Sequence, residues 1–338
     1  MVISQYWPLS PTIGWHKRAI GENGNKMSPK PSLIIISGPT GVGKTEMAIA
    51  LAAPLGGEII SADAMQVYRY MDIGTAKPTQ QEQARVRHHL IDVVDPDEPF
   101  SAARFKTAAE AVIGELHEKG HPVFVVGGTG LYIKALTRGL FKVQEGNGAL
   151  RERLRAEAKD LGSRVLHQRL QDVDPEGAAR IHPHDAYRII RALEVLELTG
   201  KPLSEHHRVH GFSDNPYQVL KIGLFLDREV LYQRINQRVD RMLEAGFLKE
   251  VKALLHRGYS PKLKSMRSIG YRHMTEYLQG NVPWDETLRR FKRDTRRYAK
   301  RQMAWFKADP EILWLQPSAI DIMSRKIDSF LTGAGFAP

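Results

Sequence analysis

A phosphate-binding loop limits the fold of this chain more than any other feature of its sequence. Residues 38–45 read GPTGVGKT and fit the pattern G-x-x-x-x-G-K-[ST]. The run Leu33–Ser37 before them has the character of a buried parallel strand, and Thr45–Leu55 after them carries apolar residues at helical spacing. A strand, a glycine-rich loop and a helix in this order predict a P-loop of an α/β protein, whose backbone N–H groups and helix N-terminus bind phosphate.

The P-loop predicts a ligand with a diphosphate or triphosphate, but it does not define the reaction. Lys44 supplies a positive charge, and the Thr45 hydroxyl is a ligand for Mg²⁺. P-loop kinases and ATPases usually add a long apolar strand that ends in an aspartate. Here the most apolar candidate, Val123–Val126, is followed by Gly127-Gly128-Thr129, which leaves Asp92 as the alternative residue for that role.

Further strand candidates alternate with helical stretches, as repeated βα units do. They are Glu58–Ser61, His89–Val93, Pro122–Val126 and Val219–Leu226. Residues 143–215 interrupt this series with an Arg-, Glu- and Ala-rich stretch of helical periodicity, and from Asp227 onward the pattern is helical again. We therefore predict a P-loop parallel sheet core with basic C-terminal helices (31–142 and 216–316), a helical insertion domain (143–215) and a disordered extension (1–30).

Composition excludes several classes of protein. The chain has no cysteine, which rules out disulfides, thiolate zinc sites, iron–sulfur clusters and cysteine nucleophiles. No apolar run reaches the ~18 residues that cross a bilayer, and residues 1–30 lack the apolar stretch of a secretory signal, so we expect a cytoplasmic protein. With 49 Lys and Arg against 38 Asp and Glu, the net charge is +11, which makes a polyanionic partner plausible.

A carboxylate follows the second strand candidate, in the segment Ser61–Tyr68 (SADAMQVY). The ends of parallel strands face one crevice, so Asp63 is expected beside the ligand of the P-loop. As an acceptor it fits a general base, while Gln66 and Tyr68 fit the recognition of a polar group. The alternative is that Asp63 only caps the helix that follows or binds Mg²⁺ through water.

A basic, aromatic segment near the C-terminus, Asp285–Ala308, contains neither proline nor glycine and predicts a long helix. One stripe carries residues at spacings of three and four, and we interpret its aromatics as core: Leu288, Phe291, Thr295, Tyr298, Gln302 and Trp305. Between Arg289 and Arg301 the other faces carry eight cations and one acid, Asp294: Arg289, Arg290, Lys292, Arg293, Arg296, Arg297, Lys300 and Arg301. Because like charges repel, a phosphodiester backbone is the natural partner; a solvated basic face is the alternative.

Basic residues gather in two further regions. The segment Arg267–Arg272 mixes arginine and tyrosine, as contacts to single-stranded RNA do. The predicted insertion adds Arg151, Arg153, Arg155, Arg188 and Arg191. Cations spread over three regions predict a large polyanion that the protein wraps around.

Eight ordered segments of the chain together resemble the tRNA dimethylallyltransferases of the bacterial type. The resemblance runs from about Leu33 to Phe306. It rests on Gly38–Thr45, Ser61–Tyr68, Asp72–Pro78 (DIGTAKP), His88–Asp92 (HHLID), Val126–Tyr132 (VGGTGLY), Ile181–Asp185 (IHPHD) with Arg188 and Arg191–Val195, Ser268–Arg272 (SIGYR), and Lys300-Arg301-Gln302.

The resemblance implies a reaction. The P-loop would hold dimethylallyl diphosphate, and the acceptor would be N6 of adenine 37 in the anticodon stem-loop of tRNAs that read codons beginning with U, giving N6-(dimethylallyl)adenosine. The implied catalytic residues are Asp63 as general base, Lys44 and Thr45, with Mg²⁺ on Thr45. The resemblance also favours a monomer. Diphosphate would bind to Gly38, Pro39, Thr40, Gly41, Val42, Gly43, Lys44 and Thr45.

The same resemblance implies a set of tRNA contacts spread over the chain. They are Asp63, Ala64, Met65, Gln66, Thr129, Arg151, Tyr187, Arg188, Ile189, Ile190, Arg191, Arg267, Ser268, Ile269, Gly270, Tyr271, Arg272, Ala299, Lys300, Arg301, Gln302, Met303, Ala304, Trp305 and Phe306.

Two other functions fit the residues without the resemblance. A P-loop kinase of a small metabolite predicts ATP turnover and has no need of the basic helix. A P-loop protein that binds RNA without chemistry predicts RNA retention that is unaffected by Asp63→Asn. The prenyl transferase predicts Asp63-dependent transfer of an allyl group to RNA.

Overall fold

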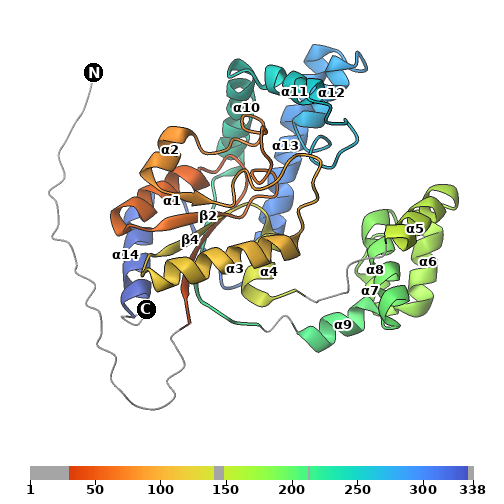
Figure 1. Ribbon diagram of the computed structural model, residues 1–338, viewed down its shortest axis with the longest axis horizontal. Helices are drawn as coiled ribbons and strands as arrows, with labels where there is room; N and C mark the ends of the chain where they lie inside the picture. Colours follow the sequence, from red (N-terminus) through yellow and green to blue (C-terminus); the bar gives the residue numbers. More distant parts are fainter. Residues whose placement is uncertain (1–29, 141–147, 212–213, 334–338) are drawn as a thin grey trace. The chain divides into compact units, whose positions relative to one another are not determined.

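The computed structural model describes residues 30–140, 148–211 and 214–333 (Figure 1). The predicted extension of residues 1–30 lies outside these ranges except for Lys30, as do residues 143–147 and 212–213 of the predicted insertion. Within the described ranges, no helix is both long and apolar enough to span a membrane.

Six parallel strands form one sheet, which confirms the predicted P-loop α/β core. The spatial order is β3-β2-β4-β1-β5-β6, so β1 lies between β4 and β5. The strands are β1 (Ser32–Ser37), β2 (Glu58–Ser61), β3 (His88–His89), β4 (Val123–Gly127), β5 (Gln218–Leu224) and β6 (Leu313–Leu315). Central strands are apolar along their length because helices cover both faces of the sheet.

Alternate residues of each strand pack against different helices. On one face, Ile34, Ile36 and Phe124 pack with α1 (Lys44–Ala52) and α14 (Ile320–Thr332), which lie together in Figure 1. On the other face, Leu33 and Val125 pack with α3 (Ala102–Glu118) and α4 (Gly130–Arg138). This alternation fixes the register of the sheet, since a slip of one residue would exchange the two faces.

The predicted helical stretch between β4 and β5 has a hydrophobic core of its own. Leu154, Leu166, Leu170, Ile189 and Leu193 are buried together there. Its helices are α5 (Gly148–Asp160), α6 (Ser163–Val173), α7 (Pro175–Ala179), α8 (Ala186–Thr199) and α9 (Leu203–His210). A separate core of this kind is what an inserted helical domain requires.

The prediction that everything after Asp227 is helical was wrong at one point. Residues Leu313–Leu315 form β6, which pairs in parallel with β5, and Trp314 packs over Gly223. A three-residue strand is too short to show periodicity, so the sequence pattern could not reveal it. The predicted strand His89–Val93 is also shorter, and only His88–His89 pair with β2.

Four long or medium helices follow β5 and complete the core on the side of the P-loop. Buried residues of all four, among them Val239, Phe247, Tyr271 and Phe291, pack into the same hydrophobic cluster as β1 and β4. The helices are α10 (Arg228–Glu244), α11 (Phe247–His256), α12 (Tyr271–Leu278) and α13 (Trp284–Lys307), with the short helices α2 (Gln80–Arg85) and η1 (Ala53–Leu55) elsewhere.

Candidate active site at the carboxyl edge of the sheet

Three loops meet where β1, β2 and β4 end. The segment after β2 is tied to the one after β4, because the Thr129 N–H donates to the Ala62 carbonyl (3.2 Å) and the Ala64 N–H donates to the Thr129 Oγ1 (3.0 Å). The P-loop follows β1, which lies next to β4. The prediction that Asp63 and the P-loop share one crevice agrees with this arrangement.

The P-loop has the backbone that its glycines predict. Gly41 and Gly43 have φ angles of +83° and +98°, a conformation that residues with a side chain rarely adopt. A Cβ atom on Gly38 would lie 2.6 Å from the Leu224 carbonyl oxygen at the end of β5. The loop therefore passes close to its neighbours, and α1 begins directly after it at Lys44.

The Lys44 ammonium occupies an unusual electrostatic environment. Its Nζ donates a hydrogen bond to the Pro39 carbonyl (2.9 Å), across the loop. Burial and the nearby Arg238 guanidinium lower the pKa of Lys44 to about 7, while Asp63 acts in the opposite direction. Burial and Arg238 thus disfavour the charged form of Lys44, and a bound anion such as diphosphate would stabilise that form.

Arg238 on α10 is a site residue that the sequence did not single out. The helix is pressed against the P-loop, since a Cβ atom on Gly41 would lie 2.9 Å from the Ile235 side chain. Arg238 comes three residues later, and its charge acts on both Lys44 and Asp63. Burial lowers the pKa of Arg238, and Asp63 opposes that shift. No described residue forms an ion pair with it. Nothing in the sequence separates it from the other arginines of α10.

The two carboxylate oxygens of Asp63 have different surroundings. Its Oδ1 accepts hydrogen bonds from the N–H groups of Met65 (2.8 Å) and Gln66 (3.3 Å), so one oxygen caps a turn after β2. The helix expected directly after Asp63 is not formed, since the next helix begins at Gln80. The Asp63 Oδ2 accepts no hydrogen bond from any described residue. The capping bonds fix the carboxylate in place and leave one oxygen available to a substrate.

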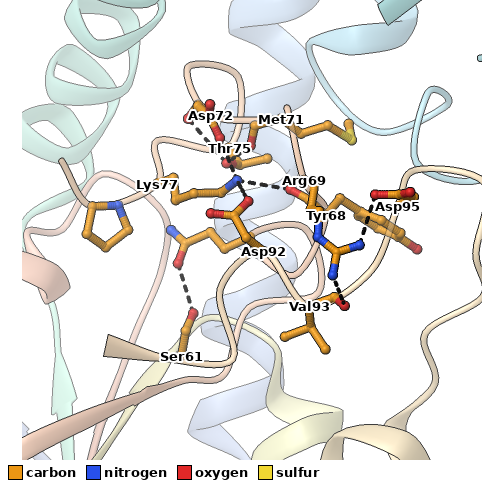
Figure 2. Close-up of polar contacts among 12 residues, drawn as sticks. Ser61, Tyr68, Arg69, Met71, Asp72, Thr75, Lys77, Asp92, Val93 and Asp95 are labelled. Carbon is orange, nitrogen blue, oxygen red and sulfur yellow. Dashed lines mark hydrogen bonds and ion pairs between the residues drawn. The ribbon is translucent and has the colours of Figure 1, made fainter. Parts of the chain in front are cut away.

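A buried lysine holds together the loops that follow β2 and β3 (Figure 2). Lys77 Nζ donates to the Tyr68 carbonyl (2.9 Å) and to the carboxylates of Asp72 and Asp92 (2.5 Å each). Its side chain is only 4% exposed. Asp92, which the sequence offered as an alternative Mg²⁺ ligand, is therefore paired with Lys77 in this structure.

Backbone strain is concentrated around the same lysine. Among the described residues, four with a side chain have positive φ angles, and all lie in these two loops: Tyr70, Ala76, Leu90 and Asp92. Such conformations persist only where surrounding contacts impose them. We infer that the bonds of Lys77 are a main part of those contacts, and Gln66, which donates to the Ala76 carbonyl (3.2 Å), ties the strained segment to Asp63.

Replacement of Lys77 by methionine is expected to lower the free energy of unfolding by about 2 kcal/mol, because it leaves two carboxylates and a carbonyl without their shared donor. Chemical denaturation measures this change. Lys119→Met, which removes an exposed i,i+4 ion pair with Glu115, is the matched control and should change stability by less than about 0.5 kcal/mol. Equal effects of the two substitutions would contradict the role given to Lys77.

The predicted tRNA contacts of the insertion differ in exposure. Tyr187 is 76% exposed, whereas Ile189 and Ile190 are buried in the core of the insertion. Arg151 and Arg191 both pair with the fully buried carboxylate of Glu194, each at 2.8 Å. Arg188 pairs with Asp185 on the surface. Glu194 thus orients two guanidinium groups whose side chains stay 40% and 37% exposed.

The predicted tRNA contacts in Arg267–Arg272 also differ in exposure to solvent. Tyr271 is 1% exposed, and its hydroxyl donates to Glu250 (2.6 Å). Gly270 is buried, Ser268 and Ile269 are half-buried, and Arg267 is exposed. Arg272 donates to Asp294 of α13 (2.7 Å). An RNA contact by this segment would therefore come from its arginines and not from the tyrosine ring.

Most cations of α13 already have partners, which corrects the view that a single acid opposes eight charges. Arg289 and Arg290 pair with Glu286, Lys292 pairs with Asp240 of α10, and Arg293 and Arg272 pair with Asp294. Partial burial alone would raise the pKa of Asp294, but the hydrogen bonds from Arg293, Arg272 and His273 hold it well below its usual range.

The last turns of α13 are where free positive charge and exposed surface coincide. Lys300 and Arg301 are exposed and pair with no acidic residue in the described part of the chain. Trp305, interpreted from its spacing as core, is 45% exposed. Met303 is half-buried and Ala304 is exposed, whereas Ala299, Gln302 and Phe306 are buried. This end of the helix is the part that fits an RNA backbone.

The fold and the site define a P-loop α/β protein in which two cations and a carboxylate with one free oxygen interact electrostatically at the carboxyl edge of the sheet. The family model described as IPP transferase matches residues 66–309. The chain belongs to this family and is therefore a transferase, which confirms the resemblance drawn from its sequence.

Individual relatives agree with the family model. The chain is 59% identical over 286 residues to the tRNA dimethylallyltransferase of Desulfosudis oleivorans, covering 85% of this chain and 91% of that protein. It is 54% identical over 305 residues to that of Desulfatibacillum aliphaticivorans, covering 90% and 100%. The crystal structure of a tRNA isopentenylpyrophosphate transferase from Bacillus halodurans matches with a TM-score of 0.68 at 42% identity, covering 90% and 98%. A eukaryotic dimethylallyltransferase acting on tRNA matches with a TM-score of 0.73 at 32% identity, covering 85% and 74%.

Proposed function

We propose that this protein transfers the dimethylallyl group of dimethylallyl diphosphate to N6 of adenine 37 in tRNAs that read codons beginning with U, forming N6-(dimethylallyl)adenosine. The observation that carries the proposal is the free Asp63 Oδ2 in the same electrostatic environment as Lys44 and Arg238. Such a site combines a hydrogen-bond acceptor for an amine with cations for a diphosphate. The names of the relatives, which are tRNA dimethylallyltransferases, support the choice of substrates.

The nucleophile is weak and needs Asp63. The lone pair of an exocyclic adenine amine is delocalised into the ring, so attack on the allylic C1 is helped by a base that accepts a proton from N6. As the new C–N bond forms at C1, the C1–O bond breaks and its electron pair leaves with the diphosphate. The N6 proton passes to the Asp63 carboxylate, which later returns it to solvent.

The leaving group needs positive charge, which the P-loop and α10 provide. Lys44, Arg238 and the backbone amides at the start of α1 face the place where negative charge develops on the diphosphate. The Thr45 hydroxyl has no hydrogen-bond partner among the described residues, which fits a ligand for Mg²⁺. Bound Mg²⁺ would add charge neutralisation on the diphosphate, since it commonly binds through one or two protein oxygens and substrate phosphates.

The acceptor base must leave its stack in the anticodon loop to reach Asp63, at a cost of a few kcal/mol. Contacts between RNA phosphates and basic residues can offset that cost. We assign these contacts to Lys300 and Arg301 on α13, to Arg267, and to Arg151 and Arg191 on the helical insertion, which we propose as a tRNA-binding domain. The anticodon stem-loop is the part of tRNA that such a surface would hold.

The reaction is tested by transfer of radiolabel from dimethylallyl diphosphate, labelled in the allyl group, to an unmodified anticodon stem-loop with adenines at 36–38. With Mg²⁺, we expect label in the RNA and none when adenine 37 is replaced by guanine. A parallel incubation with γ-labelled ATP tests the kinase alternative. No label in the RNA together with ATP turnover would overturn the proposed function.

Diphosphate binding is expected to depend on pH through Lys44. The free protein loses the Lys44 proton near its pKa of about 7, and bound diphosphate raises that pKa again, so the complex keeps a proton that the free protein has lost. Affinity for inorganic diphosphate should therefore be highest below pH 7 and fall by up to about tenfold per pH unit above it. Calorimetry measures both affinity and proton uptake.

The control for this pH dependence is Lys44→Met. Titration of the ligand itself remains in this variant, so its profile separates the two contributions. The wild-type affinity should decline more steeply above pH 7 than that of the variant. Parallel profiles would contradict the assignment of the proton to Lys44.

A further inference from the structure

Gln302 on α13 connects the RNA-facing helix directly to the P-loop. Its Oε1 accepts a hydrogen bond from the Thr40 N–H (2.8 Å), and its Nε2 donates to the Gly128 carbonyl (3.0 Å). The side chain is 6% exposed, so both bonds are shielded from water. One buried amide therefore joins a helix that follows β5 to the loops that end β1 and β4.

The glycine-rich segment after β4 is shaped to receive this helix. A Cβ atom on Gly128 would lie 2.1 Å from Gln302 Nε2, and one on Gly130 would lie 2.1 Å from the Trp305 ring. Neither glycine has a positive φ angle, so backbone conformation does not account for the presence of glycine at these two positions. The space that they leave is filled by two side chains of α13, three residues apart.

The contact extends to the proposed base. Tyr298, one turn before Gln302 on α13, is close enough to Gln302 and to Asp63 for both side chains to affect its pKa. Burial raises the pKa of Tyr298, and the Asp63 carboxylate raises it further. Thr129, next to Gly128, accepts the hydrogen bond of the Ala64 N–H beside Asp63. Gln302 thus lies where the phosphate loop, the Asp63 loop and the RNA-facing helix meet.

We propose that Gln302 is a positioning residue that couples RNA binding on α13 to diphosphate binding in the P-loop. Lys300 and Arg301, the two residues before it in the chain, are exposed on the helix surface, while Gln302 is buried. A phosphate backbone seated on the outer cations fixes the helix, and the buried amide passes this constraint to the Thr40 N–H. The inference rests on the proposed function, because it takes RNA as the ligand of α13.

The two sides of the contact offer independent variants. Gln302→Met keeps the size and removes both hydrogen bonds. Gly128→Ala adds a methyl group that displaces the end of the Gln302 side chain without backbone strain. Gln302→Glu keeps an oxygen for the Thr40 N–H and loses the donor to Gly128. If the proposal holds, the first two substitutions have the same effect, the double variant adds little to either, and Gln302→Glu recovers part of the loss.

The experiment measures the dissociation constant of inorganic diphosphate with Mg²⁺, with and without a saturating anticodon stem-loop. We expect the stem-loop to tighten diphosphate binding in the wild type by about fivefold or more. The ratio of the dissociation constant without the stem-loop to that with it should fall to about one in Gln302→Met and in Gly128→Ala. Thermal unfolding checks that both variants are folded. In the control Lys300→Ala, RNA binds more weakly, but the ratio at saturation persists.

Coupling between RNA binding and diphosphate binding can be measured without transfer of the allyl group. Failure of the role of Gln302 can therefore be distinguished from failure of the proposed reaction. An unchanged ratio in both folded variants, or no effect of the stem-loop in the wild type, would overturn the role of Gln302. Coupling that depends on Gln302 in a protein that transfers no label would count against the proposed reaction and leave the role of Gln302 supported.

Discussion

Replacement of Asp63 by asparagine is expected to slow transfer to RNA by about 10²–10⁴-fold, the usual contribution of a general base. The asparagine side chain keeps the size and an oxygen for the capping bonds from Met65 and Gln66, so the turn after β2 should persist. What it loses is the ability to accept the N6 proton. Single-turnover transfer with saturating substrates measures this step without interference from product release.

Binding should change in the opposite direction from the rate. Asp63 is the negative charge that acts on Lys44 and Arg238, so its removal makes the site more positive and diphosphate binding at least as tight as in the wild type. Asp97→Asn, the same substitution at an exposed position after the next strand, is the control and should leave the rate unchanged. A normal rate in Asp63→Asn would remove Asp63 as the base.

Replacement of Arg238 by methionine should lower kcat/KM for dimethylallyl diphosphate by about 10²–10³-fold, as expected when one charge that stabilises a developing anion is lost. The guanidinium acts on Lys44, and among the described residues it forms no ion pair that the substitution would break. The effect should therefore fall on the diphosphate and not on stability. Initial rates at varied diphosphate concentration, with unfolding measured in parallel, separate the two.

The Arg238 variant should also shift the pH profile of diphosphate binding. Arg238 lowers the pKa of Lys44, so its removal raises that pKa and moves the decline in affinity to higher pH. Arg241→Met, three residues later and exposed on α10, is the matched control, for which we expect no shift. An unchanged profile in Arg238→Met would show that the two cations do not share one site.

The local motifs were predictable because each has its own physical signature. The P-loop shows its strand, glycines and helix within a short window, and the parallel sheet then places Asp63 near it. Arg238 and Gln302 could not be found in this way. Their roles depend on α10 and α13 packing against loops that precede them by 174 residues or more in the chain, as with Gln302 and Gly128. No periodicity or spacing encodes such contacts.

The charge of α13 illustrates a second limit. The sequence shows eight cations between Arg289 and Arg301 of one helix. The acidic partners of several of them, Glu286, Asp240 and Asp294, come from the first turn of the helix, from α10 and from its own middle. Only the folded arrangement separates Lys300 and Arg301 from the paired cations. A count of charges along the chain therefore overestimates the surface that is available to RNA.

The most direct test of the central claim is a crystal structure of the protein with an anticodon stem-loop and a non-transferable diphosphate analogue, in which sulfur replaces the oxygen on C1. We predict the diphosphate on the amides of Gly38–Thr45, with Lys44 and Arg238 in contact with it, and N6 of adenine 37 within hydrogen-bond distance of Asp63. Diphosphate bound elsewhere, or an adenine whose N6 points away from Asp63, would contradict the account.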